Sequence, residues 1–184
     1  MSDINKELED NFNKAEKLRN SGKLLEAINI FTNILKENSN FQPAINNIAN
    51  CYFQLNKFDL AEKYYLKFLE INSENLLIIN NLSLLYLKTK NFKKALLVLE
   101  KSLKKNSNQE HVIEKIAYCL TELNLIDEVD KFCKQFLKIY PKNKTILSYY
   151  RRNLFKIGRY EEGLKSYQKE TGVIEFNNDK INII

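Results

Sequence analysis

The chain has 184 residues, of which 44% are hydrophobic and 11% aromatic, enough for one packed domain. Four glycines, two prolines and the lack of alternating Val/Thr-rich runs argue against a β-sheet. No apolar run approaches the roughly 20 residues of a membrane span, and residues 1–10 contain no apolar core for export. The cysteines Cys51, Cys119 and Cys133 lack CxxC spacing, which predicts reduced, buried thiols in a cytoplasmic protein without a zinc site.

The net charge of +6 is unevenly distributed. Residues 131–169 hold eleven Lys and Arg but only two acidic residues, a local charge of +9, so the rest of the chain sums to −3. This imbalance suggests an acidic partner near the C-terminal end. Solubility of a Lys-rich, Asn-rich chain is the simpler explanation, so the charge of the partner stays open.

A helical pattern recurs along the chain. After a short polar leader, residues 1–7, the first repeat covers residues 8–41, with helices expected at about 7–20 and 24–36 and a turn at Gly22. The second repeat, residues 42–75, contains two apolar stripes of helical spacing separated by a turn at Asn56. The first stripe is Ile45, Ile48, Ala49 and Tyr52, and the second is Phe58, Ala61, Tyr65 and Phe68.

Three further repeats, residues 76–109, 110–143 and 144–171, follow in the same register, and residues 172–184 form a tail. Ala27, Ala61, Ala95 and Val129 lie 34 residues apart. A small residue at this interval between two amphipathic helices predicts one helical hairpin stacked repeatedly on itself. The apolar tail residues Val173, Ile174 and Phe176 could fold back over the last hairpin or dock on a partner, and the sequence leaves both open.

This 34-residue unit resembles the tetratricopeptide repeat. The match is fullest in residues 42–75, where the family's apolar and small positions are filled, with Ile45 in place of the usual Trp. The resemblance covers about residues 8–171 and implies an all-α fold, a right-handed α-solenoid of about five tetratricopeptide-type helical hairpins. The first helix of each hairpin would line a concave groove.

Members of this family usually bind a peptide or protein segment in that groove, which implies a non-enzymatic scaffold or adaptor without a cofactor. The groove positions carry the candidate peptide-binding residues Asn13, Asn46, Asn47, Asn50, Asn80, Asn81, His111, Lys115, Tyr149 and Arg152. Asn13, Asn47 and Asn81 share one register, and a column of amides can pair with an extended peptide backbone whatever its sequence. The column resembles the asparagine ladder of glycosyltransferase members of the family. Alternatively, these asparagines only reflect an Asn-rich composition.

Some family members clamp the terminal carboxylate of a chaperone with Lys, Asn and Arg side chains. Asn50 and Asn81 match that set, Lys115 stands for the Arg, His111 stands for one Lys, and Asn46 replaces the other. Because charge-assisted hydrogen bonds are the strong ones, and only one sure cation is present, a neutral groove is favoured over a clamp.

The fifth repeat would place Tyr149, Arg152, Phe155 and Lys156 in the groove. Aromatic and cationic groups together suit an acidic or aromatic segment or single-stranded nucleic acid, although a solvated charged face is the simpler interpretation.

Two other functions stay open beside the protein-binding scaffold. An RNA-binding solenoid resembling pentatricopeptide proteins is less favoured, because those repeats are longer and their base-reading positions are not evident here. The second open function is that of an accessory subunit of a separate transferase or hydroxylase, since related repeats often precede such domains in one chain. The lone His111 and the lack of a Gly-rich phosphate loop or nucleophile motif argue against an enzyme. Membrane contact is not indicated, and the oligomeric state is open.

Overall fold

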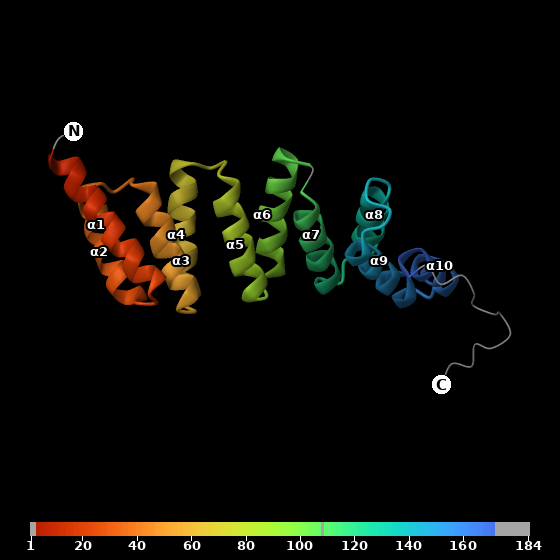
Figure 1. Cartoon of the computed structure of the whole chain (residues 1–184). Helices are drawn as coiled ribbons and strands as arrows, with labels where there is room; N and C mark the ends of the chain where they lie inside the picture. The colour runs from red at the N-terminus through yellow and green to blue at the C-terminus, as the bar shows by residue number, and fades with distance from the viewer. Residues whose placement is uncertain (1–2, 108, 172–184) are drawn as a thin grey trace. The chain divides into compact units, whose positions relative to one another are not determined.

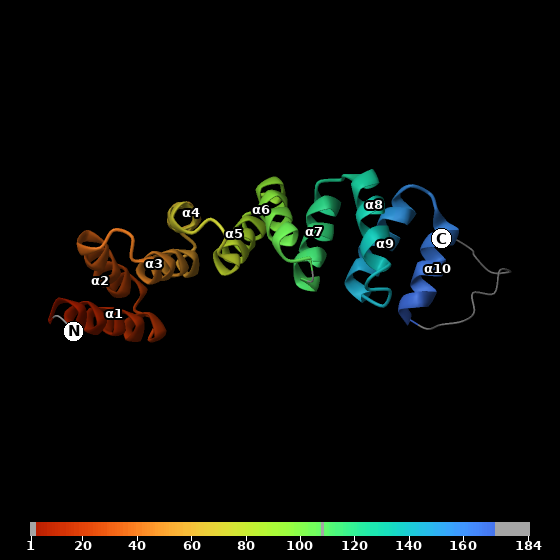
Figure 2. The same ribbon diagram turned by 90° about the horizontal axis from the view of Figure 1, so that it is seen from above.

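The computed structural model describes residues 3–107 and 109–171, which form ten α-helices and no strand (Figures 1 and 2). Consecutive helices pair into hairpins, which confirms the all-α solenoid type of fold with five tetratricopeptide-like units. The helices are α1 (Asp3–Asn20), α2 (Leu24–Glu37), α3 (Gln42–Gln54), α4 (Phe58–Ile71), α5 (Leu76–Lys88), α6 (Phe92–Lys105), α7 (Glu110–Glu122), α8 (Ile126–Leu137), α9 (Lys144–Lys156) and α10 (Tyr160–Thr171).

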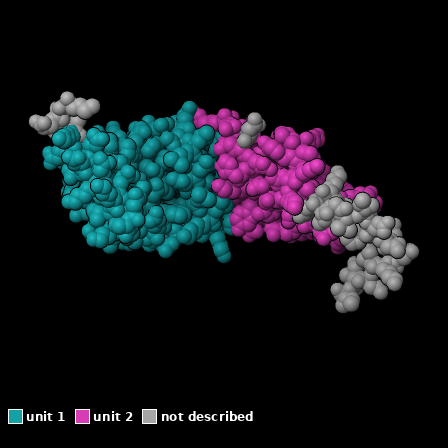
Figure 3. Space-filling model, in the orientation of Figure 1, with its two compact units in different colours: residues 1–102 teal, residues 103–184 magenta. Residues whose placement is uncertain are grey.

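The chain divides into two compact units (Figure 3). Unit 1, Met1–Ser102, holds α1 to α5 and most of α6, and unit 2, Leu103–Ile184, holds the end of α6 and α7 to α10. The division into a leader, a solenoid and a tail stays a prediction, because residues 172–184 lie outside the described residues.

The first helix starts earlier than the pattern predicts. α1 begins at Asp3, four residues before the expected start at Glu7. Residues 3–7 contain neither Gly nor Pro, the two residues that most strongly oppose a helix. The spacing of apolar residues therefore underestimates the length of a helix whose first turn is polar.

The 34-residue period is also present in the backbone. A left-handed residue follows the first helix of every hairpin, at Gly22, Asn56, Lys90, Asn124 and Gly158. The next N–H then donates to a carbonyl five residues back, as from Lys57 to Tyr52 at 2.9 Å and from Asn91 to Tyr86 at 2.8 Å. This is the bond that closes a helix C-terminus in the Schellman motif. The predicted turns at Gly22 and Asn56 are thus confirmed.

The small residues of the period lie in the core of unit 1. Ala27, Ala61 and Ala95 are completely buried, and the large side chains of Phe31 and Tyr65, one turn farther along α2 and α4, are buried beside them. α2 packs against α3, and α4 packs against α5, so the second helix of one hairpin covers the first helix of the next. A larger side chain at the alanine positions would push these helices apart.

Unit 2 is built in the same way with different side chains. Val129 and Cys133 on α8 are buried, and α9 packs against both α7 and α8. Gly163 takes the small position of the last hairpin, where an added Cβ would collide with the ring of Phe155. The glycine therefore permits Phe155 to pack directly on the backbone of α10.

The cysteines are free and buried, as predicted. Burial raises the pKa of Cys51 and of Cys119 to about 11, and that of Cys133 to about 12. None of the helices in the described part of the chain combines the length and apolar character that crossing a bilayer requires.

Candidate functional site

An amide cluster connects the first helices of the second and third hairpins in unit 1. On α3, Asn50 Nδ2 donates to Asn46 Oδ1 at 3.3 Å, because residues four apart lie on one face of a helix. On α5, Asn81 Nδ2 donates to Asn50 Oδ1 at 3.4 Å. The buried Tyr65 of α4 donates its hydroxyl to the same Asn50 oxygen at 2.6 Å, and so fixes the orientation of this amide.

The amide cluster of Asn46, Asn50 and Asn81 has unused hydrogen-bonding groups. Within the described residues, Asn46 Nδ2 has no acceptor and Asn81 Oδ1 has no donor, and both side chains are partly exposed. On α5, Leu77 and Leu84 lie one turn to either side of Asn81 and are 61% and 43% exposed. The arrangement presents a donor, an acceptor and two apolar side chains to solvent.

Asn47 and Asn13 are placed differently. Asn47 is only 5% exposed, accepts from Arg19 Nη1 at 2.8 Å and donates to Glu16 Oε1 at 3.2 Å. Arg19 and Glu16 also form an ion pair at 3.3 Å on α1. Both ends of the Asn47 amide are therefore engaged between α1 and α3, whereas Asn13 is exposed on α1. The expected column of Asn13, Asn47 and Asn81 stays a prediction, and its middle member is tied to the fold.

Asn80 lies beside Asn81 on α5, but its environment differs. Its Oδ1 is buried and has no hydrogen-bond partner within the described residues. A buried acceptor without a partner costs free energy, so a donor that reached this oxygen would be favoured.

The remaining predicted residues belong to unit 2. His111 is exposed on α7, and burial lowers the pKa of the half-buried Lys115 on the same helix. Tyr149 on α9 lies 6.1 Å from the ring of Tyr118 on α7, and the Arg152 guanidinium lies 5.7 Å from the Tyr149 ring. Tyr149 and Arg152 therefore form one aromatic and cationic group, and its role in binding stays a prediction.

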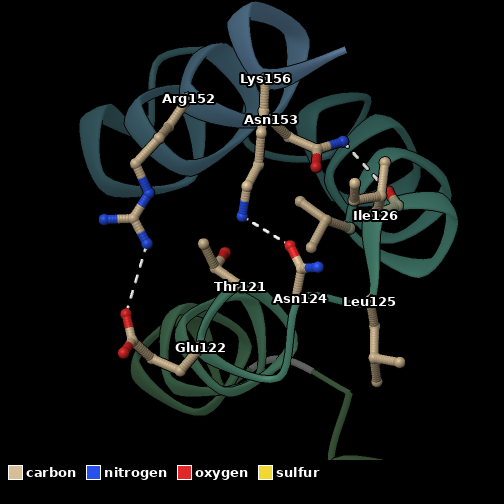
Figure 4. Close-up of a pocket in the computed structure, with 9 residues that line it drawn as sticks. Thr121, Glu122, Asn124, Leu125, Ile126, Arg152, Asn153 and Lys156 are labelled. Carbon is tan, nitrogen blue, oxygen red and sulfur yellow. Dashed lines mark hydrogen bonds and ion pairs between the residues drawn. The ribbon is translucent and has the colours of Figure 1, made fainter.

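A pocket of about 520 Å³ lies beside this group in unit 2 (Figure 4). Arg152 Nη2 lies 3.4 Å from Glu122 Oε1, and Lys156 Nζ donates to Asn124 Oδ1 at 2.5 Å across the opening. The lining residues are Thr121, Glu122, Asn124, Leu125, Ile126, Val129, Arg152, Asn153 and Lys156. Each cationic side chain has one polar partner across the opening, and each keeps further N–H donors that a ligand could use.

Asn153, inside this pocket, was missed by the sequence analysis. Its Nδ2 donates to the Ile126 carbonyl at 3.0 Å, and the side chain is buried. The second, third and fourth repeats have Cys51, Leu85 and Cys119 at this position of the period, all buried. A polar residue at a position that is apolar in the three preceding repeats was the signal that could have identified it.

No group of three His, Cys, Asp or Glu side chains with the spacing of a metal site occurs in residues 3–107 and 109–171. The candidate sites in the two units consist of amides, aromatic rings and paired charges. Such groups bind other molecules by hydrogen bonds and by cation–π contacts.

Comparison with known proteins agrees with this description. Two tetratricopeptide repeat family models match the chain, at residues 43–75 and 78–108. No curated protein sequence shows significant similarity to it.

Solved structures share the fold at low sequence identity. MamA AMB-1 is 18% identical, with 91% of each chain covered and a TM-score of 0.74. Another crystal structure of MamA is 15% identical, with 88% of each chain covered and a TM-score of 0.75. YrrB, described as a TPR protein with an unusual peptide-binding site, is 19% identical, with 91% of this chain and 90% of YrrB covered and a TM-score of 0.73.

Proposed function

We propose that this chain is a tetratricopeptide-repeat protein and that unit 1 binds an extended segment of a protein partner. The family match and the fold support a protein-interaction scaffold. The segment would lie on the exposed face of α3 and α5, where Asn46, Asn50 and Asn81 form the amide cluster.

The open donor and acceptor of the amide cluster carry this proposal. Asn46 Nδ2 and Asn81 Oδ1 are complementary to the carbonyl and N–H groups of a peptide backbone. An extended peptide exposes both kinds of group along its length, so it can satisfy both amides at once. Because Asn50 and Tyr65 hold the cluster in place, little side-chain entropy would be lost on binding.

The chemistry around the cluster favours a neutral segment with apolar side chains. Leu77 and Leu84 flank Asn81 and are exposed, so apolar side chains of a partner would bury them. The nearby charges of Glu16 and Arg19 neutralise each other. Binding to unit 1 should therefore depend weakly on salt, unlike binding to nucleic acid. The description of YrrB supports the proposal, since it attributes peptide binding to a protein of the same fold.

Selection from a library of displayed random peptides tests the proposal. Peptides that bind the full chain would be synthesised with a fluorescent label and titrated by polarisation against the wild type and the double variant Asn46→Leu, Asn81→Leu. Removing two hydrogen-bonding groups should weaken binding about tenfold or more. The matched control is Asn29→Leu, Asn33→Leu, which changes two exposed asparagines of α2 four residues apart. Equal affinity of the two double variants would contradict the proposed site.

A further inference from the structure

The pocket of about 520 Å³ in unit 2 contains an oriented hydrogen-bond acceptor (Figure 4). This acceptor belongs to Asn153 on α9, a side chain that is only 4% exposed. Because the Ile126 carbonyl can only accept, the nitrogen of the Asn153 amide faces it at 3.0 Å, and Oδ1 points into the pocket. Within the described residues this oxygen has no hydrogen-bond partner.

The helical repeat does not require an amide at this position. Cys51, Leu85 and Cys119 fill the equivalent position of the three preceding repeats, and those hairpins form with apolar side chains there. An almost buried oxygen that meets no protein donor gains free energy when a donor reaches it. Asn153 therefore marks the pocket as a place where a donor group of another molecule is favoured.

Two cationic side chains stand at the opening of the pocket. Arg152 and Lys156 lie four residues apart on one face of α9. Arg152 pairs with Glu122 at 3.4 Å, and Lys156 uses one of its three N–H groups for Asn124 Oδ1 at 2.5 Å. Their remaining N–H groups, and Nδ2 of Asn124, have no acceptor within the part of the chain that the structure describes. Two cations against one carboxylate leave the pocket with a charge of +1.

The surface around the pocket is also basic. The sequence of α9 contains four Lys and Arg and no acidic residue, and residues 131–169 together carry a charge of +9. A surface with such an excess of one sign attracts molecules of the opposite sign and orients them before contact. The charge therefore favours an acidic partner over a neutral or basic one.

The pocket has an apolar part as well. Leu125 and Ile126 are half-buried and Val129 is buried, and all three line the pocket at the start of α8. A ligand that carried only charge would leave these side chains in contact with water. An apolar group next to the charged one would bury them, and this burial is favourable.

We propose that this pocket binds an Asp or Glu side chain within a segment of a protein partner. The carboxylate would accept hydrogen bonds from Lys156 and Arg152, and a backbone N–H of the segment would donate to Asn153 Oδ1. A neighbouring apolar side chain would contact Leu125 and Ile126. One carboxylate neutralises the charge of +1, so each kind of group in the pocket has a complementary group in the segment. This site is separate from the peptide site of unit 1, and its affinity should fall with salt, whereas that of unit 1 should not.

Titration of the ¹⁵N-labelled full chain with three short peptides, followed by NMR, tests the proposal. The first probe, acetyl-Leu-Glu-amide, has an apolar side chain, backbone N–H groups and a side-chain carboxylate. The second, acetyl-Leu-Gln-amide, lacks the carboxylate, and the third, acetyl-Leu-Gln with a free C-terminus, carries it on the backbone. The acidic first probe should shift the side-chain amide signals of Asn153 and Asn124. It should bind about tenfold more tightly than the neutral second probe, and several-fold more weakly at high salt.

Three variants locate the binding. Lys156→Gln, at an exposed residue, should lower the affinity for the acidic probe to nearly that for the neutral one. Lys144→Gln removes the same charge from an exposed residue of α9 outside the pocket and should have little effect, so it is the matched control. Asn153→Leu, which copies Leu85 of the third repeat, should weaken binding of the acidic probe about fivefold, and the spectrum itself reports whether the fold is retained.

Three outcomes would overturn the proposal. The first is equal affinity for the acidic and the neutral probe. The second is a Lys156→Gln effect no larger than that of Lys144→Gln. The third is tighter binding of the probe with the free C-terminus, which would assign the pocket to a chain terminus instead of an acidic side chain. None of these results bears on the amide cluster of unit 1, because the pocket contains no residue of that cluster.

Discussion

Replacing Lys90 by glycine should stabilise the chain, although it removes a side chain. Lys90 has a φ of 57°, in the left-handed region, and the equivalent turns have Gly or Asn. Its backbone N–H donates to the Leu87 carbonyl at 3.1 Å, a bond that glycine retains. The Lys90 side chain is exposed and forms no hydrogen bond or ion pair within the described residues. The substitution therefore changes mainly the backbone strain.

The expected gain follows from three contributions. The left-handed conformation costs a residue with a Cβ roughly 1–2 kcal/mol, which glycine avoids. Glycine gives the unfolded chain more conformational freedom, which offsets about 0.5–1 kcal/mol of this. Loss of a cation near the C-terminus of α5 offsets a few tenths more at low salt. The net increase in the free energy of unfolding should be about 0.5 kcal/mol, and Lys90→Asn should give a smaller one.

Urea unfolding followed by circular dichroism, at high salt to screen the charge change, measures this difference. The matched control is Lys101→Gly, at an exposed lysine inside α6, where glycine should destabilise by about 1 kcal/mol. If both substitutions lower the midpoint by similar amounts, the left-handed turn carries no strain and the reasoning is wrong.

The remaining predictions concern the core, the thiols and one ion pair. Ala61→Leu should lower stability by about 1–3 kcal/mol in urea unfolding, because the completely buried position leaves no space. The pKa of Cys133, raised by burial to about 12, should make its reaction with a disulfide reagent at about pH 8 roughly a thousandfold slower than that of an exposed thiol, and unfolding should abolish the difference. Burial alone would raise the pKa of Glu62, but hydrogen bonds from Lys94 and Tyr86, both at 2.7 Å, and the Lys94 charge lower it. Glu62 should therefore contribute stability above its unfolded pKa of about 4.3 and lose it as the pH falls through the lower folded value, so the difference from Glu62→Gln in urea midpoint should shrink in acid.

The repeated hairpin could be predicted because the features that define it are local and periodic. Ala27, Ala61 and Ala95 mark positions where two helices pack closely, and each is completely buried. Gly22 and Asn56 mark left-handed turns, and both have positive φ. Lys90 shows the limit of this reasoning, since no property of lysine indicates such a turn. Its conformation follows only from its place in the period.

The side-chain partners at the candidate site could not be predicted in the same way. Asn47 and Asn81 hold equivalent positions, but Asn47 is engaged by Arg19 and Glu16, residues 28 and 31 positions earlier, whereas Asn81 contacts Asn50. Such contacts depend on which side chain the neighbouring hairpin presents at each position. The sequence register gives equivalent sites, and only the packed structure shows which amides keep an open group.

The separation between repeated and variable positions has a functional consequence. The small and apolar positions satisfy the packing of the hairpins, so the predicted groove positions are free to differ without loss of the fold. In unit 1 they carry the amides of Asn46 and Asn81 with open hydrogen-bonding groups, and in unit 2 they carry Tyr149 and Arg152. Amides recognise a peptide backbone with little regard to its sequence, whereas a ring and a guanidinium select particular side chains. The affinity of unit 1 for a partner segment should therefore depend mainly on whether that segment is extended. Selectivity among partners should depend on the residues that differ between the repeats, such as Tyr149 and Arg152.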